Sequence, residues 1–147
     1  MKIIDTPWNV TSKLACLKSS GVKTIIRYYN FSNSRSLPEK CLQLDEAQHI
    51  CAQGMSIVVV FQQRQNKAED FSREKGLSSG RRAYSYARDS IGQPENSAIY
   101  FGVDFDADDS EFVSNILPFF QGVKEAFEFE SNGIVWVLTV PALFVRS

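Results

Sequence analysis

Short apolar segments alternate with longer helix-like segments along the chain, and this alternation restricts the fold more than any other feature. The apolar segments are rich in β-branched residues, as buried strands are. Helical spacing of apolar residues marks the segments between them. Strands separated by crossover helices predict right-handed βαβ units and a parallel sheet. The predicted strands are residues 3–5, 22–29, 55–62, 98–104 and 133–138, and the predicted helices are residues 11–20, 44–53, 78–91 and 110–129.

Polar side chains gather at the ends of the predicted strands. Segment 97–106 is the clearest case, because its apolar run ends in two carboxylates, Asp104 and Asp106. Alternate side chains of a strand share a face, so these two aspartates are expected to point the same way. Parallel sheets bind their ligands at the carboxyl ends of the strands. The sequence therefore predicts one polar rim, made of Asp5, Arg27, Tyr28, Gln62, Asp104 and Asp106.

Charge and hydropathy indicate no macromolecular partner. The net charge is −1 and the charged residues are interspersed, so neither nucleic acid nor a membrane surface is expected as a partner. No apolar run reaches membrane-spanning length, and the first residues lack a signal core. We expect a cytoplasmic product as encoded, with signal-independent export or release to the cell wall as the alternative.

Neither a cofactor nor a metal is indicated. Residues 78–82 open a helix without the spacing of a glycine-rich phosphate loop. The acidic segment 104–111 lacks the glycine that a calcium loop needs at its turn, so Asp109 and Glu111 are expected to favour the next helix N-terminus. The three cysteines show no Cys-x-x-Cys spacing, which predicts buried free thiols.

Several motifs resemble one known family when they are taken in order. They are Ile-Asp-Thr at the first strand, Ile-Ile-Arg-Tyr at the second, Glu46-Ala47 before Gly54, and Tyr-Phe-x-Val-Asp-Phe-Asp at residues 100–106. Over residues 3–130 the chain resembles the DUF1906 glycoside hydrolase-like domain, which is related to the barrel lysozymes of glycoside hydrolase family 25. The resemblance implies a (β/α)8 TIM-barrel fold with a site at its C-terminal rim, and an enzyme that acts on bacterial cell-wall glycans.

The chain departs from the family pattern in three places. The resemblance to family 25 lysozymes implies the pattern Asp-x-Glu at the fourth strand. Here Asp106 stands in place of the glutamate, and its side chain is shorter by one methylene. A complete barrel needs at least ~200 residues, so we expect residues 1–147 to form a single domain with about five βα units of an incomplete barrel. Residues 136–147 do not match the family, and we interpret residues 137–147 as an out-of-frame tail after a frameshift near Trp136.

The strand-end acids receive candidate roles from this resemblance. Glycan hydrolysis needs one carboxyl that protonates the leaving oxygen and a second that acts as nucleophile or base. We expect Asp106 to be the general acid, Asp104 its electrostatic partner, and Asp5 a contact to the substrate or transition state. The candidate substrate-binding residues are Arg27, Tyr28, Gln62 and Trp8.

Alternatives remain open for these residues and for the function. Arg27 can instead pair with a rim acid, Tyr28 can pack under a loop, and Trp8 can cover the core. The first functional hypothesis is a glycoside hydrolase-like enzyme acting on a peptidoglycan-type glycan. The second is a non-catalytic carbohydrate-binding domain or an inactive truncated remnant. The open sheet edges of an incomplete barrel also predict low stability or self-association.

Overall fold

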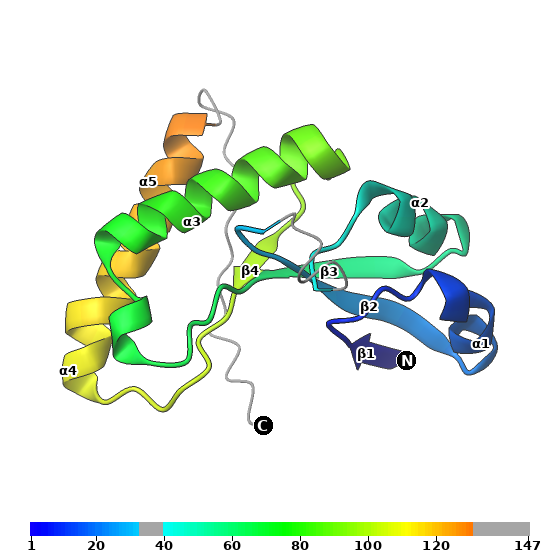
Figure 1. Ribbon diagram of the computed structural model, residues 1–147, viewed down its shortest axis with the longest axis horizontal. Coiled ribbons are helices and arrows are strands. Elements are labelled where there is room, and N and C mark those ends of the chain that lie inside the picture. Colours follow the sequence, from blue (N-terminus) through cyan, green and yellow to red (C-terminus); the bar gives the residue numbers. More distant parts are fainter. Residues whose placement is uncertain (33–39, 131–147) are drawn as a thin grey trace.

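The computed structural model describes residues 1–32 and 40–130, which form a parallel four-stranded sheet with helices packed against it (Figure 1). The strands lie in sequence order, β1-β2-β3-β4, and all neighbours are parallel. Four of the predicted strands are thereby confirmed. The predicted strand 133–138 and the predicted out-of-frame tail lie outside the described residues. The strands are β1 Lys2–Asp5, β2 Val22–Tyr29, β3 Ser56–Phe61 and β4 Ile99–Phe101.

Helices follow each strand, as the alternation predicts. Gly21 and Gly54 have φ of 86° and 76° and end the first two helices in the left-handed conformation that glycine adopts without strain. The helices are α1 Leu14–Ser19 after the 3-10 turn Thr11–Lys13, α2 Leu44–Ala52, α3 Arg73–Ser85 with a π-helical continuation Tyr86–Ile91, α4 Asp109–Glu111 with a π-helical continuation Phe112–Ile116, and α5 Leu117–Glu130; a short 3-10 turn, Ala68–Asp70, precedes α3.

Two element boundaries differ from the sequence prediction. Helix α3 begins at Arg73 rather than at residue 78, because the Ser72 hydroxyl accepts a hydrogen bond from the Lys75 N–H at 3.1 Å and caps the helix there. Strand β4 ends at Phe101, although the apolar run that predicts it continues to Val103. The two aspartates of segment 97–106 therefore follow the regular strand instead of ending it.

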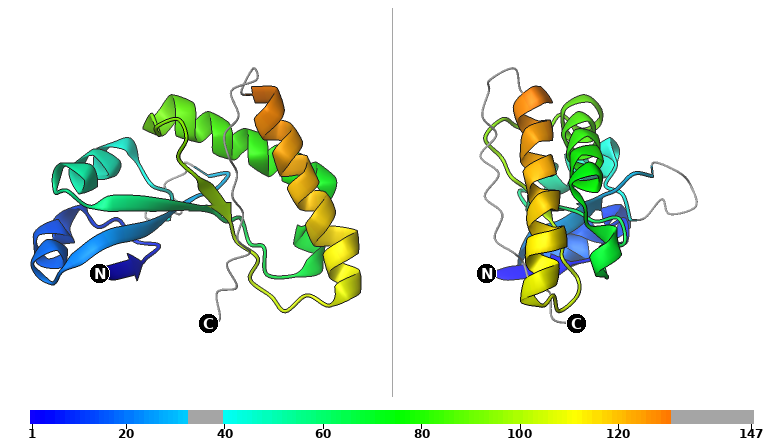
Figure 2. Two further views of the ribbon diagram at one scale, coloured as in Figure 1. Left: turned by 180° about the vertical axis from the view of Figure 1, so that it is seen from behind. Right: turned by 90° about the vertical axis from the view of Figure 1, so that its left-hand side faces the viewer.

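The sheet buries one face more completely than the other. On β2, Ile25, Arg27 and Tyr29 are fully buried, whereas Ile26 and Tyr28 between them are only partly buried. The buried side chains contact helices: Tyr29 packs edge-on against Tyr86, with 5.0 Å between ring centroids. Figure 2 shows the helices of the molecule arranged around the sheet from two further sides. Alternate side chains of a strand point to opposite faces of a sheet, so Ile25, Arg27 and Tyr29 share the more buried face.

Helices α3 and α5 cross at very short range through glycine (Figure 1). A Cβ on Gly76 would overlap the backbone of Phe119, and one on Gly122 would overlap the Arg73 carbonyl oxygen. At Gly80 it would lie 2.8 Å from the Ala126 Cβ. The two backbones touch because these positions have no side chain, so the crossing requires glycine at them.

An aromatic cluster joins β4 to α5. The Phe101 ring lies 6.2 Å from the centroids of Phe119 and Phe127, and 5.4 Å from Phe61 on β3.

The cysteines are free, as predicted, but only Cys41 is buried, while Cys16 and Cys51 are exposed. Among residues 1–32 and 40–130, no helix combines the length and the apolar character that crossing a membrane requires.

Candidate functional site at the carboxyl ends of the strands

The strongest polar contact at the rim joins β1 to β2. Asp5 is the last residue of β1, and Tyr28 is the penultimate residue of β2. The Tyr28 hydroxyl donates a hydrogen bond to Asp5 Oδ1 at 2.6 Å, a length typical of an O–H bond to an ionised carboxylate. The Asp5 side chain is exposed and that of Tyr28 is half-buried, so the pair lies at the surface of the rim.

The surroundings of Tyr28 hold its phenol in the protonated form. Burial is the largest cause, and the hydrogen bond to Asp5 and the charge of Asp5 add to it; together they raise the pKa of Tyr28 well above its usual range. The charge of Arg27 lowers this pKa, and the charge of Asp104 raises it slightly. Asp104 thus belongs to the electrostatic environment of the Asp5–Tyr28 pair. At neutral pH the rim offers a neutral hydroxyl donor beside carboxylate acceptors.

Both aspartates of segment 97–106 are exposed. Between them, Phe105 packs against Phe71, with 5.7 Å between ring centroids. The strand prediction gave the wrong reason for their placement, because the regular strand ends at Phe101. What anchors this segment is the inward packing of Phe105, together with a hydrogen bond from the Asp104 N–H to the Gln65 carbonyl oxygen at 2.9 Å.

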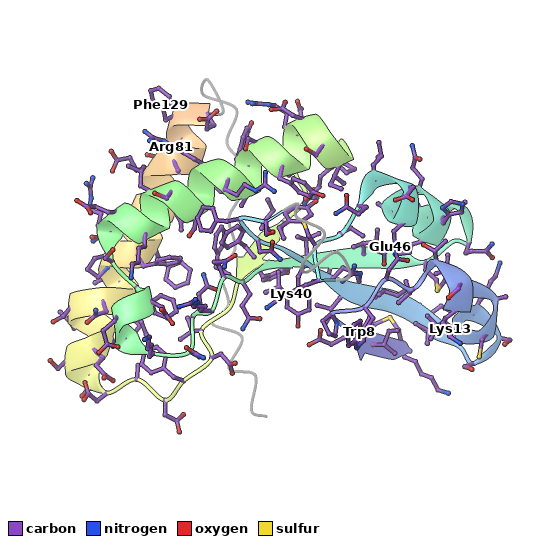
Figure 3. All side chains as sticks on the ribbon, in the orientation of Figure 1. Trp8, Lys13, Lys40, Glu46, Arg81 and Phe129 are labelled. Carbon is purple, nitrogen blue, oxygen red and sulfur yellow. The ribbon has the colours of Figure 1, made fainter. Side chains whose placement is uncertain are left out.

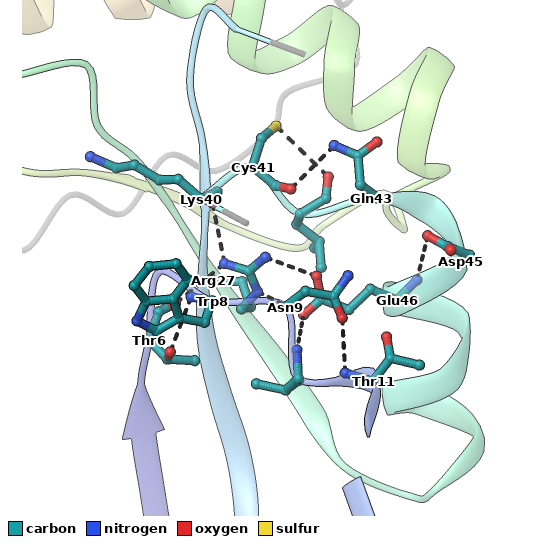
Figure 4. A network of polar contacts seen from close by, with 12 residues as sticks. Thr6, Trp8, Asn9, Thr11, Arg27, Lys40, Cys41, Gln43, Asp45 and Glu46 are labelled. Atoms are coloured by element: carbon teal, nitrogen blue, oxygen red, sulfur yellow. Dashed lines mark hydrogen bonds and ion pairs between the residues drawn. The ribbon is translucent and has the colours of Figure 1, made fainter. Parts of the chain in front are cut away.

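Arg27 is fully buried and does not lie on the rim surface (Figure 4). Its guanidinium forms a two-pronged ion pair with Glu46 of α2: Nε donates to Oε2 and Nη2 to Oε1, each at 2.8 Å. The predicted alternative, an ion pair between Arg27 and a rim acid, is wrong in its partner, because the acid is Glu46 of α2 and not an aspartate at a strand end. This burial corrects the expectation that the Arg27 side chain is displayed toward a substrate.

The Arg27–Glu46 pair also fastens the loops that follow β1 and β2. Arg27 Nη1 donates to the carbonyl oxygens of Thr6 and Lys40, each at 3.2 Å, and Glu46 Oε2 accepts from the Val10 N–H at 3.1 Å (Figure 4). A planar guanidinium can satisfy several acceptors at fixed angles, which suits it to this junction. The backbone on the C-terminal side of Asp5 is therefore held by a buried charge pair.

Sequence reasoning missed Glu46 as a partner, although one signal was present. Glu46 lies on the same side of α2 as the buried residues Ala47 and Ile50, and a carboxylate on an apolar helix face requires a cation. Lys40 was also missed. Its Nζ lies 5.8 Å from the centroid of the Tyr28 ring and brings a positive charge to the rim.

The remaining predicted residues, Trp8 and Gln62, flank the rim. Trp8 lies in the loop after β1 and is 62% exposed, so it does not cover the core (Figure 3). The backbone N–H of Trp8 donates to Thr6 Oγ1 at 3.1 Å. Gln62 directly follows β3 and is half-buried, and its Nε2 lies 3.4 Å from the Arg64 carbonyl oxygen. The contacts of both residues with a substrate stay predictions.

The family model that matches the chain places it in the glycoside hydrolase-like class. The chain belongs to the family described as the Rv2525c-like, glycoside hydrolase-like domain, whose model matches residues 15–134. This match confirms the family resemblance seen in the motifs.

Curated relatives come from Bacillus subtilis (strain 168). The uncharacterized protein YbfG is 35% identical over 126 residues, which is 84% of this chain and 17% of YbfG. The uncharacterized protein FadG is 31% identical over 122 residues, which is 82% of this chain and 21% of FadG. The chain therefore spans only about a fifth of the length of these relatives.

Solved structures share the fold at low sequence identity. The Tat-secreted protein Rv2525c of Mycobacterium tuberculosis, crystallised in complex with HEPES, superposes with a TM-score of 0.71 at 20% identity, over 83% of this chain and 61% of that chain. An uncharacterized protein of B. stearothermophilus superposes with a TM-score of 0.62 at 20% identity, over 86% of this chain and 55% of that chain.

Proposed function

We propose that this domain binds a peptidoglycan-type glycan at the rim and cleaves it, with Asp106 as the general acid and Asp104 as its electrostatic partner. Asp5, held by Tyr28, contacts the sugar. The observation that carries this proposal is the hydrogen-bonded Asp5–Tyr28 pair, with the charge of Asp104 acting on the same tyrosine, in a member of a glycoside hydrolase-like family. Carboxylates beside a neutral hydroxyl match the alternating donors and acceptors of sugar hydroxyl groups.

The proposal includes the barrel architecture. Strands in the order β1-β2-β3-β4 add on the same side at each step, so right-handed crossovers place their helices on one face. A (β/α)8 barrel is built in this way, whereas a doubly wound sheet reverses its strand order. The partly buried Ile26, Tyr28, Val60 and Tyr100 would then face the barrel interior. Within the described residues the sheet is open at β1 and β4, and these edges support the proposal of self-association.

The site of action follows from the proposed substrate. Cell-wall glycan lies outside the cytoplasm, and the structural relative Rv2525c is described as Tat-secreted. We accordingly place the activity of the domain at the cell wall.

A second candidate is glycan binding without cleavage. A general acid works best when it is shielded from water or lies close to another charge, because its proton is then retained near neutral pH. Asp106 is exposed, and its side chain is one methylene shorter than the glutamate that related lysozymes carry at this position. Exposure therefore favours a binding role for this residue.

Muropeptide release separates the two candidates. Purified sacculi are incubated with the 147-residue chain, and soluble products are measured by chromatography while bound protein is measured by sedimentation. Cleavage predicts release that Asp106→Asn reduces at least tenfold, with Asp109→Asn on α4 as the matched control. If the wild-type chain binds sacculi without releasing muropeptides, the second candidate is supported. If the wild-type chain neither binds nor releases, the proposal is contradicted.

A further inference from the structure

Two consecutive residues after β3 have a backbone conformation that side chains disfavour. Arg64 and Gln65 have φ of 64° and 60°. A residue with a side chain in this conformation is strained, and it persists only where the surroundings hold it in place. Strain of this kind is found at functional sites more than elsewhere. The segment lies at the rim, directly after Gln62.

The Gln65 side chain supplies the contacts that hold this turn. It is 2% exposed and faces two acceptors, the carbonyl oxygens of Phe61 and Gly102. We assign the amide nitrogen to the side that faces these two acceptors, an orientation in which it donates to Gly102 at 2.9 Å and to Phe61 at 3.1 Å. Phe61 ends β3 and Gly102 follows β4. The amide therefore adds to the backbone hydrogen bond from the Gly102 N–H to the Phe61 carbonyl oxygen, at 3.2 Å, where the regular strand pairing stops.

The backbone of the same residue holds Asp104. The Gln65 carbonyl oxygen accepts the Asp104 N–H at 2.9 Å. Gln65 therefore fixes three points at once: the end of β3, the end of β4 and the first candidate acid. The same residue that has the left-handed φ therefore also supplies the acceptor for Asp104.

We propose that Gln65 is a positioning residue that holds Asp104 at the rim, in reach of the ligand that the Asp5–Tyr28 pair binds. The proposal rests on the proposed function for its effect on glycan binding, but the positioning itself is a property of the free protein. Sequence reasoning had assigned a role at this strand end to Gln62 instead.

Hydrogen exchange tests the positioning without any ligand. Gln65→Met keeps the length and burial of the side chain and removes both amide donors. The Asp104 amide is expected to exchange at least tenfold faster, while the Ile25 amide on β2 stays within about twofold. Arg64→Gly is the matched control, since it relieves the left-handed strain of the neighbouring residue and leaves the Gln65 contacts intact. Unchanged exchange at Asp104, or equal acceleration at Asp104 and Ile25, would overturn the proposal.

A double-variant cycle tests whether Gln65 acts through Asp104 on ligand binding. Affinity for chitotetraose is measured for Gln65→Met, Asp104→Asn and the double variant. If Gln65 acts by positioning Asp104, the double variant binds within about twofold of Asp104→Asn alone. If the affinity loss of the double variant is instead the product of the two single-variant losses, Gln65 and Asp104 act independently and the positioning role is contradicted. A wild-type chain that binds neither chitotetraose nor sacculi refutes the proposed function, and the exchange experiment then still decides the role of Gln65.

Discussion

The two ends of the molecule are held together by opposite means. At the β1–β2 end, a fully buried ion pair between Arg27 and Glu46 fastens two loops and a helix. At the other end, α3 crosses α5 because glycines such as Gly76 and Gly122 leave no side chain between the backbones. The first junction is destabilised when one charged side chain is removed, and the second is destabilised when a Cβ is added to a glycine. The end that carries the Asp5–Tyr28 pair thus depends on matched charge, whereas the helical end depends on contact distance.

The largest effect is expected from breaking the buried ion pair. Glu46→Ala leaves the Arg27 guanidinium buried without its counter-charge and is expected to lower the free energy of unfolding by about 3–5 kcal/mol. Urea unfolding followed by circular dichroism measures it. The control replaces both partners, as Arg27→Met with Glu46→Leu, which is expected to cost less than Glu46→Ala because no unpaired charge remains. Its remaining cost comes from the Val10 N–H and the Thr6 and Lys40 carbonyl oxygens, which lose their side-chain partners. An equal loss in the double variant would show that the charges are not what holds this end.

Adding one methyl group tests the helical end. Gly76→Ala places a Cβ against the Phe119 backbone and is expected to cost about 1–3 kcal/mol of unfolding free energy, as overpacked cores do. Thermal or urea unfolding measures the loss. Ser78→Ala on the exposed side of the same helix is the matched control and is expected to stay within about 0.5 kcal/mol of wild type. If the two variants behave alike, α3 and α5 can separate without penalty.

A smaller effect is expected at the start of α4, where the helical end relies on polar contacts. Asp108 accepts from the Glu111 N–H at 2.8 Å, and the Glu111 carboxylate accepts from the Asp108 N–H at 3.0 Å. Asp108→Ala is expected to cost about 1 kcal/mol, and Asp108→Asn a fraction of that, because asparagine caps helices almost as well. Chemical denaturation of both variants provides the comparison, and equal losses would argue against the capping interaction.

The smallest effect is expected from an exposed ion pair that bridges α3 and α5. Arg73 and Glu125 form an ion pair whose side chains are 59% and 50% exposed. Exposed pairs contribute about 0–1 kcal/mol, so a double-mutant cycle with Arg73→Ala and Glu125→Ala is expected to give a coupling in that range. Salt at 1 M should reduce it further. A coupling above ~2 kcal/mol would show that a charge pair also stabilises the α3–α5 end to a substantial extent.

Much of the fold could be predicted from sequence because each element carries local signals. The β-branched run 22–29 matches β2, and the glycine stops after α1 and α2 are where the pattern places them. Prediction failed where tertiary contacts decide. The apolar run at 102–103 does not reveal that the regular pairing of β4 with β3 ends at Phe101, and charged residues before residue 78 conceal the Ser72 cap.

The candidate site was predictable in part for the same reason. Strand ends and residue types located Asp5 and Tyr28, since both follow from the parallel sheet. The burial of Arg27 was not predictable from its own strand, because its partner arrives with α2. Gln65 carried no signal at all, since its left-handed backbone and its two carbonyl acceptors exist only after β3 and β4 have paired.

The contrast between the two ends also sets an order of assembly. Arg27 and Glu46 are 19 residues apart, whereas the Arg73–Glu125 contact between α3 and α5 spans 52. Closing the shorter loop costs less chain entropy, and contacts between nearby residues form faster. Synthesis proceeds from the N-terminus, so Arg27 and Glu46 leave the ribosome well before α5. We therefore expect the Arg27–Glu46 junction to form before α3 and α5 cross, so that its two charges are already neutralised when the later helices pack.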